Sequence, residues 1–423
     1  MPFSQTRVFS PLFEIFVRNS LINAIRTAQV KPTLKVPLRR SAIAPRFALA
    51  QNNVNVKGAQ RDVSLGLTPM ENIARARSDL RMGLPVIVKA DRMALCLPVE
   101  TLTSERLEAI RSLADEHLLV LTDRRAHTLK LAAYDQDLVR IDLPMSFDKR
   151  WVQSVADPST DLSYPMKGPF RCKRGGEVSI ERTILALLKS AQLLPAAIVT
   201  YIEDPAPLIG QYLTEINASL TLKTLSQEVG LNDVIKARVP IQEALNSKLH
   251  IFRPDDGSIE HFGFEVGKLD LSQPILVRLH SACFTGDVLG SLKCDCGPQL
   301  RGALRHMGEA GSGMLLYLNQ EGRGIGLTNK MRAYSLQDEG FDTVEANHRL
   351  GFEDDERDFR LGASILKEMG VRCIRLMTNN PAKIEMMERQ GITVSERVPL
   401  IIKPNAQNVH YLATKAKKSQ HLL

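Results

Sequence analysis

Residues 278–299 read RLHSACFTGDVLGSLKCDCGPQ, and this stretch holds three of the chain's six cysteines within fourteen positions. Cys294 and Cys296 flank a single acidic residue, and Gly297 follows them before an apolar-periodic run, so one tight loop presents two thiols. Cys283 lies upstream, with ten residues between it and Cys294. Three sulfur donors suit Zn²⁺, and a site with three protein ligands leaves a fourth tetrahedral position for water, as in catalytic zinc sites.

Two other interpretations also fit the spacing of the cysteines. In the first, His280 or His306 completes a closed, structural zinc site. In the second, the cysteines are ordinary buried residues that bind no metal.

The composition indicates a globular protein of two or three domains without a membrane segment. The chain has 423 residues, of which 44% are hydrophobic, and this is enough to form large cores. Its longest nearly uninterrupted apolar run, residues 193–202, contains Pro195 and Thr200 and is far too short to span a bilayer. None of the six cysteines stands at disulfide-framework spacing, which points to a reducing compartment, so we expect a cytoplasmic protein.

The net charge of +8 belongs to the first residues of the chain. Residues 1–60 contain nine Lys or Arg and one acidic residue, Glu14, whereas the other 363 residues hold 46 basic and 46 acidic side chains. This balance argues against a nucleic-acid-binding face, so we expect no nucleic-acid partner. We interpret residues 1–67 as a basic leader that is disordered, or is a transit peptide that directs the protein to an organelle, or precedes a true start at Met70.

Residues 68–205 alternate helix signals and strand signals. The run MENIARARSDLRMG predicts a helix that ends at Gly83, and LPVIVK, residues 84–89, has the β-branched content of a strand. SERLEAIRSLADE and HLLVLTD predict a second helix and a second strand. Residues 171–202 then predict a Gly turn, a long helix and a further strand.

The motifs DLR-x-G-x-PVIV, LTSE and GG…ER…A-x-L…L-PAAIV, in this order, resemble dihydroxybutanone phosphate synthase, which builds the sugar-derived part of riboflavin. The metal-binding and catalytic residues of that family are absent from this chain. The segment MALCLPV follows Asp91 and Arg92, at the position where the family has an acidic loop that holds Mg²⁺. Residues 179–182 read SIER where the family has Gly-His-Thr-Glu. Without carboxylates nothing holds a hard cation or moves a proton, so the resemblance implies a non-catalytic relative. An unrelated α/β domain is the alternative.

We expect residues 206–233 to form a helical connector and residues 234–423 to form a second domain. The first part of this domain, as far as Cys283, alternates apolar and polar residues as a meander of strands does. From Gly297 the pattern changes to helix and strand units, and the strand MLLYLN precedes the loop QEGRG and another helix. Backbone N–H groups and the guanidinium of Arg323 in such a loop suit a phosphate group. The chain is therefore predicted to be α/β, of mixed α+β type, with two domains.

Several motifs in one order make the C-terminal region similar to GTP cyclohydrolase II. They are RLHSACFTGDVLGSLKCDCGPQL, LNQEGRGIGLTNKMRAYSLQDEGFDTVEANHRLGFEDDERDF, and LMTNNPAKIEMMERQGI with ERVPLI. The resemblance implies one catalytic Zn²⁺ per chain on the three cysteines, whose acidified water attacks C8 of guanine and opens the imidazole ring. Formate and pyrophosphate then leave, and the product is the diamino-pyrimidinone ribosylamine phosphate that begins riboflavin synthesis. The resemblance also implies GTP as substrate, Mg²⁺ with the triphosphate, and a homodimer.

The resemblance assigns roles to individual residues. Asp355 and Arg357 match the family's proton acceptor and nucleophile, and Tyr334 matches a tyrosine that positions the ring for its second hydrolysis. Because arginine is almost never deprotonated, Arg357 is equally interpreted as an electrostatic clamp on the departing pyrophosphate. The GTP contacts fall on Arg278, Leu279, His280, Ser281, Ala282, Gln299, Glu321, Gly322, Arg323, Thr343, Thr378 and Lys383.

One residue departs from the family pattern. The family usually reads R-x-H-S-E-C, whereas this chain has RLHSAC, so Ala282 replaces a glutamate next to the first cysteine. A carboxylate there would orient water, bind a cation or contact substrate. Its loss leaves two alternatives to GTP hydrolysis, which are a cyclohydrolase-like activity on another nucleotide and a non-catalytic, nucleotide-binding regulatory protein.

Overall fold

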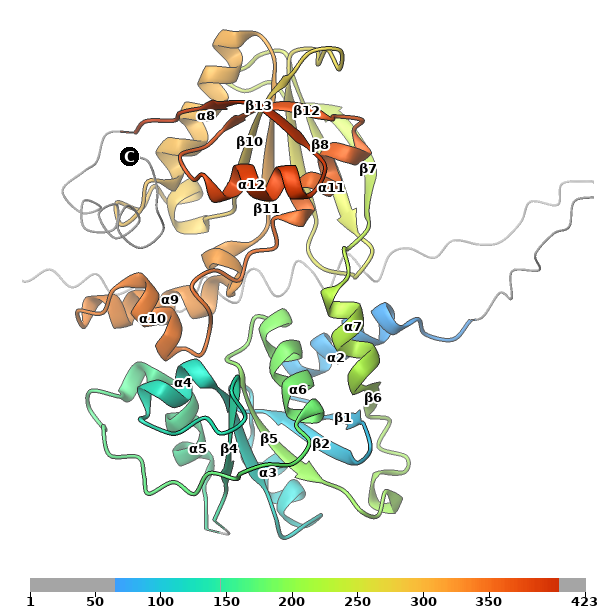
Figure 1. The fold of residues 1–423 in the computed structure, drawn as a ribbon, viewed down its shortest axis with the longest axis vertical. Coiled ribbons are helices and arrows are strands. Elements are labelled where there is room, and N and C mark those ends of the chain that lie inside the picture. The colour runs from blue at the N-terminus through green and yellow to red at the C-terminus, as the bar shows by residue number, and fades with distance from the viewer. Residues whose placement is uncertain (1–64, 145, 403–423) are drawn as a thin grey trace, which may run out of the picture. The chain divides into compact units, whose positions relative to one another are not determined.

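The computed structural model describes residues 65–144 and 146–402. The predicted leader lies outside the described residues, except for residues 65–67. Two β-sheets organise the described chain (Figure 1), which confirms the mixed α/β class and the two-part arrangement. We call residues 65–226 the first-sheet region and residues 231–402 the second-sheet region.

Six strands form the first sheet, in the order β4-β3-β5-β2-β1-β6. All neighbours are antiparallel except β1 and β6, which pair in parallel. The strands are β1 (Val86–Lys89), β2 (Met93–Pro98), β3 (Leu118–Thr122), β4 (Leu138–Asp142), β5 (Ala196–Tyr201) and β6 (Thr214–Asn217).

Helices cover both faces of the first sheet. Leu118 and Val120 of β3 pack in one core with α2 and α6, whereas Leu119 and Leu121 pack in another core with α3 and α5. This alternation follows from the two-residue period of a strand. The helices are α2 (Pro69–Arg81), α3 (Ser104–Arg111), α4 (Asp123–Thr128), α5 (Lys149–Ala156), α6 (Ser179–Ser190) and α7 (Ala218–Ser226).

Strands β1 and β2 are joined by only three residues. Lys89 pairs with Met93, so Ala90, Asp91 and Arg92 form the whole turn between the two strands. Strand β2 that follows is almost entirely buried. A turn of three residues is too short to contain the acidic loop that dihydroxybutanone phosphate synthases have at this position.

Seven strands form the second sheet, in the order β13-β12-β10-β11-β9-β8-β7. Helix α8 packs on one face, through Ala303 and Met307, and helices α11 and α12 pack on the other. The strands are β7 (Leu231–Arg238), β8 (Ser247–Pro254), β9 (His261–Val266), β10 (Ile275–Ser281), β11 (Gly313–Leu318), β12 (Cys373–Met377) and β13 (Thr393–Val398). The helices are α8 (Cys296–Ala310), α9 (Gly326–Asp338), α10 (Thr343–Arg349), α11 (Arg360–Glu368) and α12 (Ala382–Arg389).

The predicted meander is wrong at its last strand. Strands β7, β8 and β9 pair in antiparallel order as expected, but β9 pairs next with β11, and β10 pairs in parallel with both β11 and β12. A parallel neighbour requires a crossover of a dozen or more residues, and α8 provides it between β10 and β11.

The predicted helical connector, residues 206–233, has a different local structure. Residues 214–217 form β6, whose side chains alternate between buried and exposed and which pairs in parallel with β1. Helix α7 follows directly, and β7 begins at Leu231. The predicted connector therefore contributes to both sheets, through β6 in the first and the start of β7 in the second. The segment TEIN has the two-residue period of a strand. No helix within the described residues is long and apolar enough to cross a membrane.

We expect Leu366→Ala to lower the free energy of unfolding by about 2–5 kcal/mol, because this α11 side chain is fully buried and its loss leaves a cavity. The urea unfolding curve measures this change. The control is Leu271→Ala, since the Leu271 side chain is 57% exposed and its replacement should cost less than about 0.5 kcal/mol. Equal losses in the two variants would contradict the assignment of this core.

Candidate active site

The carboxyl ends of three neighbouring parallel strands meet at one pocket. Because β10 pairs in parallel with β11 and β12, the residues that follow these strands emerge at the same edge of the sheet. The pocket there brings together all the predicted site residues except Asp355: Arg278, Leu279, His280, Ser281, Ala282, Cys283, Cys294, Cys296, Gln299, Glu321, Gly322, Arg323, Tyr334, Thr343, Arg357, Thr378 and Lys383.

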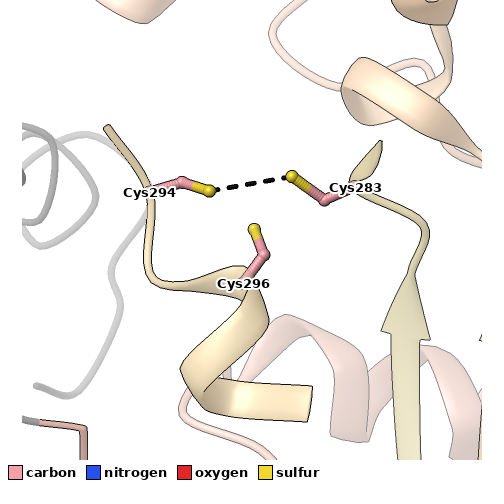
Figure 2. A group of neighbouring side chains, drawn as sticks. All are labelled: Cys283, Cys294 and Cys296. Carbon is pink, nitrogen blue, oxygen red and sulfur yellow. Dashed lines mark hydrogen bonds between the residues drawn. The ribbon is translucent and has the colours of Figure 1, made fainter. Parts of the chain in front are cut away.

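The three cysteine side chains point toward one another (Figure 2). Cys283 follows β10, and Cys294 and Cys296 lie in the loop and first turn that begin α8. Their Sγ atoms all lie within 4.8 Å of one another, and those of Cys283 and Cys294 are 3.7 Å apart. None of the three is in a disulfide. Within residues 65–144 and 146–402, no other cluster of His, Cys, Asp or Glu has this potential to hold a metal.

Gly286 keeps clear the space in which the sulfurs gather. A Cβ atom at this position would lie 2.7 Å from Sγ of Cys294, 3.1 Å from Sγ of Cys283 and 3.0 Å from Cβ of Cys296. No side chain therefore fits at residue 286 without displacing a cysteine. Three soft donors around a space kept free by glycine fit Zn²⁺.

Lys330 of α9 places a positive charge beside the sulfurs. Its Nζ atom donates a hydrogen bond to Sγ of Cys283 at 3.1 Å and another to Oε1 of Glu321 at 2.8 Å. Burial opposes the charge, but Glu321, Tyr334 and Cys283 outweigh burial, and the pKa of Lys330 lies above its ordinary value. The ammonium group is therefore retained in the pocket at neutral pH.

The surroundings of Cys283 favour its thiolate form. Hydrogen bonds from the Cys294 and Cys296 thiols, together with the Lys330 ammonium, hold the pKa of the Cys283 thiol far below its usual range. A thiolate is the form of cysteine that binds a metal.

His280 is bound away from the three sulfurs. Its Nε2 atom lies 3.0 Å from Oδ2 of Asp287, and the Tyr317 hydroxyl and the backbone N–H of Cys283 donate to the same oxygen, each at 3.0 Å. Burial lowers the pKa of His280, although Asp287 opposes the shift. The other alternative fourth ligand, His306, is exposed on α8 and is not in the sulfur cluster.

A chain of hydrogen bonds connects Arg278, Gln299 and Asp295. The guanidinium of Arg278 donates to the Met377 carbonyl at 2.9 Å and to the side-chain oxygen of Gln299, whose amide group donates to the Asp295 carboxylate. Burial lowers the pKa of Arg278 to about 10. Such a desolvated cation gains strongly from an anionic ligand.

The turn that follows β11 has an unusual backbone. Gly322, Arg323 and Gly324 have φ angles of 63°, 62° and 95°, and Arg323 is thus a non-glycine residue in the left-handed region. A Cβ atom at Gly324 would lie 2.6 Å from the Glu356 carbonyl oxygen, so only glycine fits there. At the start of the turn, the Glu321 carboxylate accepts a hydrogen bond from the backbone N–H of Phe284 at 2.6 Å.

Asp355 contacts the pocket through Arg357. The Nε atom of Arg357 donates to the Asp355 carboxylate at 2.8 Å, a second guanidinium nitrogen bonds the other oxygen, and Nη1 reaches Oγ of Ser281 at 3.4 Å. Burial opposes ionisation of Asp355, but Arg357 outweighs it and lowers the pKa of this carboxyl group. The two residues form a bidentate ion pair in which Arg357 is the member that lines the pocket.

The other predicted residues line the pocket from three helices and one loop. Lys383 of α12 donates to the Leu279 carbonyl at 3.2 Å, and the buried Thr378 follows β12. Thr343 is the first residue of α10. Burial raises the pKa of Tyr334, in α9, to about 12.

Sequence reasoning missed five polar residues of the pocket: Lys330, Gln337, Asn347, Asn379 and Asn380. For Lys330 a signal existed, because it precedes Tyr334 by four residues and so lies on the same face of a helix. Asn379 and Asn380 directly follow the predicted Thr378. Nothing in the local sequence distinguishes Gln337 or Asn347 from solvent-exposed helix residues.

Comparison with known proteins relates the chain to one enzyme family. A family model described as GTP cyclohydrolase II matches residues 232–399. The GTP cyclohydrolase-2 of Azospirillum brasilense is 40% identical over 362 residues, which cover 84% of this chain and 94% of that protein. The GTP cyclohydrolase-2 of Cronobacter sakazakii is 57% identical over 164 residues, which cover 39% of this chain and 83% of that protein. The first of these alignments is too long to be confined to the second-sheet region.

Among solved structures, a two-domain 3,4-dihydroxy-2-butanone 4-phosphate synthase from A. baumannii matches 79% of this chain and 100% of its own, with 13% sequence identity and a TM-score of 0.28. At this TM-score the match supports no inference about the fold or the site.

We expect Gly286→Ala to lose bound metal while the protein stays folded, because the added Cβ atom would clash with Cys294 and Cys283. Zinc per chain after dialysis and far-UV circular dichroism measure the two properties. The control is Gly302→Ala in α8, where the nearest atoms to a new Cβ are the flexible side-chain ends of Ile402 and Leu400. Full zinc content in Gly286→Ala would contradict this account of the cysteine cluster.

Proposed function

The chain belongs to the GTP cyclohydrolase II family, and from this membership and the pocket described above we propose that it hydrolyses GTP with release of formate and pyrophosphate. The product is 2,5-diamino-6-(5-phosphoribosylamino)pyrimidin-4(3H)-one, and the reaction is the first step of riboflavin biosynthesis. The observation that best supports this proposal is the presence of three cysteines and five cationic side chains in one pocket. The five cations are Arg278, Arg323, Lys330, Arg357 and Lys383, and among the described residues Glu321 is the only carboxylate that lines the pocket.

In this proposal Cys283, Cys294 and Cys296 hold one Zn²⁺. The metal, when bound there, supplies Lewis-acid activation of water for the hydrolysis of C–N bonds. Lys330 balances part of the negative charge of the thiolates, since its ammonium group lies 3.1 Å from Sγ of Cys283. Asp287 orients the Cys283 backbone through the hydrogen bond from its N–H group.

Gln299 and Glu321 read the edge of the guanine ring. An amide oxygen and a carboxylate together accept hydrogen bonds from ring N–H and amino groups, and an amide NH₂ donates to the ring carbonyl. Arg278 fixes the orientation of Gln299, and Lys330 fixes that of Glu321, through the hydrogen bonds described above. Tyr334 lies beside Lys330 and positions the opened ring for its second hydrolysis.

The cationic and hydroxyl side chains of the pocket bind the triphosphate and the ribose, and Mg²⁺, when bound to the substrate, would neutralise part of the phosphate charge. Arg278, Arg323 and Lys383 provide charge, and Thr343 and Thr378 provide hydroxyl donors. We assign Arg357 to stabilisation of the departing pyrophosphate, because its guanidinium lines the pocket and arginine is almost never deprotonated in a protein. Asp355 is ionised and accepts a proton. The enzyme is proposed to act as a cytoplasmic homodimer.

Incubation of the full chain with GTP, Zn²⁺ and Mg²⁺ should yield formate, pyrophosphate and the pyrimidinone product in equal amounts, as measured by mass spectrometry and enzymatic assays. We expect Cys294→Ser to abolish this turnover and to lower bound zinc while circular dichroism stays unchanged, because the surrounding core does not depend on the metal. Equal turnover by Cys294→Ser and the natural protein would refute the zinc-dependent mechanism.

Ala282 supplies the only reason to consider another nucleotide as substrate. Its backbone N–H donates to the Leu318 carbonyl at 2.8 Å, so the residue is fixed just after the carboxyl end of β10, next to Cys283. We expect Ala282→Glu to raise GTP turnover by up to about 10²-fold, the range of a general base. Ala282→Gln is the control, since it adds the same volume without the charge. Low GTP turnover by all three proteins, with high turnover of a different purine ribotide by the natural one, would favour the alternative substrate.

A further inference from the structure

Helix α9 faces two parts of the protein. Ala333 and Tyr334 line the pocket together with Lys330, whereas Asn329 and Arg332 contact the first-sheet region. Asn329 and Ala333 are four residues apart and therefore lie on the same face of α9. A displacement of α9 at its contacts with the first-sheet region would therefore also move residues that line the pocket.

The contacts of α9 with the first-sheet region are polar and well formed. Arg332 bonds the Glu100 carboxylate at 3.1 Å and the Asp157 carboxylate at 3.0 Å. The fully buried side chain of Asn329 donates to the Gln192 carbonyl at 3.0 Å. These three contacts fix the helix along one side.

The loop of residues 351–358 is held by the same region. The buried hydroxyl of Thr122 donates to the Gly351 carbonyl at 2.9 Å. Arg124 binds the Glu353 carboxylate with two nitrogens, at 2.9 Å and 2.7 Å. Lys189 binds Glu356 at 2.7 Å. This loop also contains Asp355 and Arg357. The three tethered residues therefore lie close along the chain to the ion pair whose Arg357 lines the pocket.

An apolar contact completes the junction. Leu194, from the turn between α6 and β5, is a member of the small core that α9 and α10 share. The other buried members of this core are Ile325, Ala333, Leu336, Ala346, Leu350 and Phe352. The first-sheet region thus supplies part of the packing beneath one wall of the pocket.

We propose that the first-sheet region is a positioning domain, whose residues Glu100, Asp157, Arg124 and Lys189 hold α9 and the loop of residues 351–358 in the geometry that GTP turnover requires. The three cysteines are positioned by β10 and α8 of the second sheet, and α9 reaches them through the hydrogen bond from Lys330 to Sγ of Cys283. Loss of the tethers should therefore lower kcat and leave zinc content unchanged. The kinetic part of this inference rests on the proposed function.

The first experiment neutralises the partners of Arg332 without altering the second-sheet region. In the full chain, Glu100→Gln combined with Asp157→Asn should lower kcat about three- to tenfold, with a smaller change in KM and unchanged zinc content. Amide hydrogen exchange of residues 327–338 should become faster. The control is Glu215→Gln, which removes an exposed ion pair with Lys89, between β6 and β1 of the same region, and should leave kcat unchanged.

The second experiment is a charge swap across the other tether. Arg124→Glu places two carboxylates against each other and should lower kcat by a similar factor, and Arg124→Glu combined with Glu353→Arg should restore kcat to within about twofold of the natural value. Restoration by the swap excludes simple misfolding as the cause. Unchanged kcat in Glu100→Gln/Asp157→Asn and in Arg124→Glu, or failure of the swap to restore activity, overturns the inference.

The two proposals fail in different ways. If the natural chain does not hydrolyse GTP, the proposed function is wrong, and hydrogen exchange of residues 327–338 still tests the tethers. Unchanged exchange in Glu100→Gln/Asp157→Asn, with normal GTP turnover, overturns the positioning role alone.

Discussion

Parallel pairing of β10 with both β11 and β12 is the constraint on which the pocket depends. It brings three strand ends to one edge of the sheet. Three segments therefore face a common space: the cysteine-containing residues 283–296, the turn of residues 321–324, and residues 378–380. The crossover through α8 is part of the same arrangement, since its first turn contains Cys296. The fold and the cysteine cluster are therefore not separable, because the connection that makes the sheet parallel also brings the second and third sulfurs to the first.

The charged side chains of the pocket stabilise one another. Lys330 contacts both Cys283 and Glu321, and each partner stabilises its ammonium group. Burial lowers the pKa of Arg278, although Asp295 and Cys296 oppose the shift, so the charged guanidinium gains free energy when an anion binds beside it. A ligand with several phosphates offsets these desolvation costs, whereas a neutral nucleoside does not. This difference gives the pocket a physical basis for selecting a polyphosphate.

Sequence reasoning was most successful where the chemistry is local. The spacing of Cys283, Cys294 and Cys296 and the glycines around Arg323 are visible within short segments, and the structure brings these segments together. The partner order of β10 was not predictable in this way, because an alternating pattern indicates a strand but not its neighbours. The role of Lys330 depends on a contact 47 residues away along the chain, and the tethers of Arg332 on contacts 175 and 232 residues away. Only a tertiary structure reveals contacts of that kind.

The tethers between the two regions have a consequence for how the sequence is able to change. Substitutions at the surface of a protein ordinarily have little effect on its stability. Glu100 and Asp157 are constrained more tightly, because both carboxylates bind the same Arg332 guanidinium and a positive charge in place of either one would lie against it. A change of charge at Glu100 or Asp157 should therefore be accompanied by a change at Arg332 among descendants of this gene.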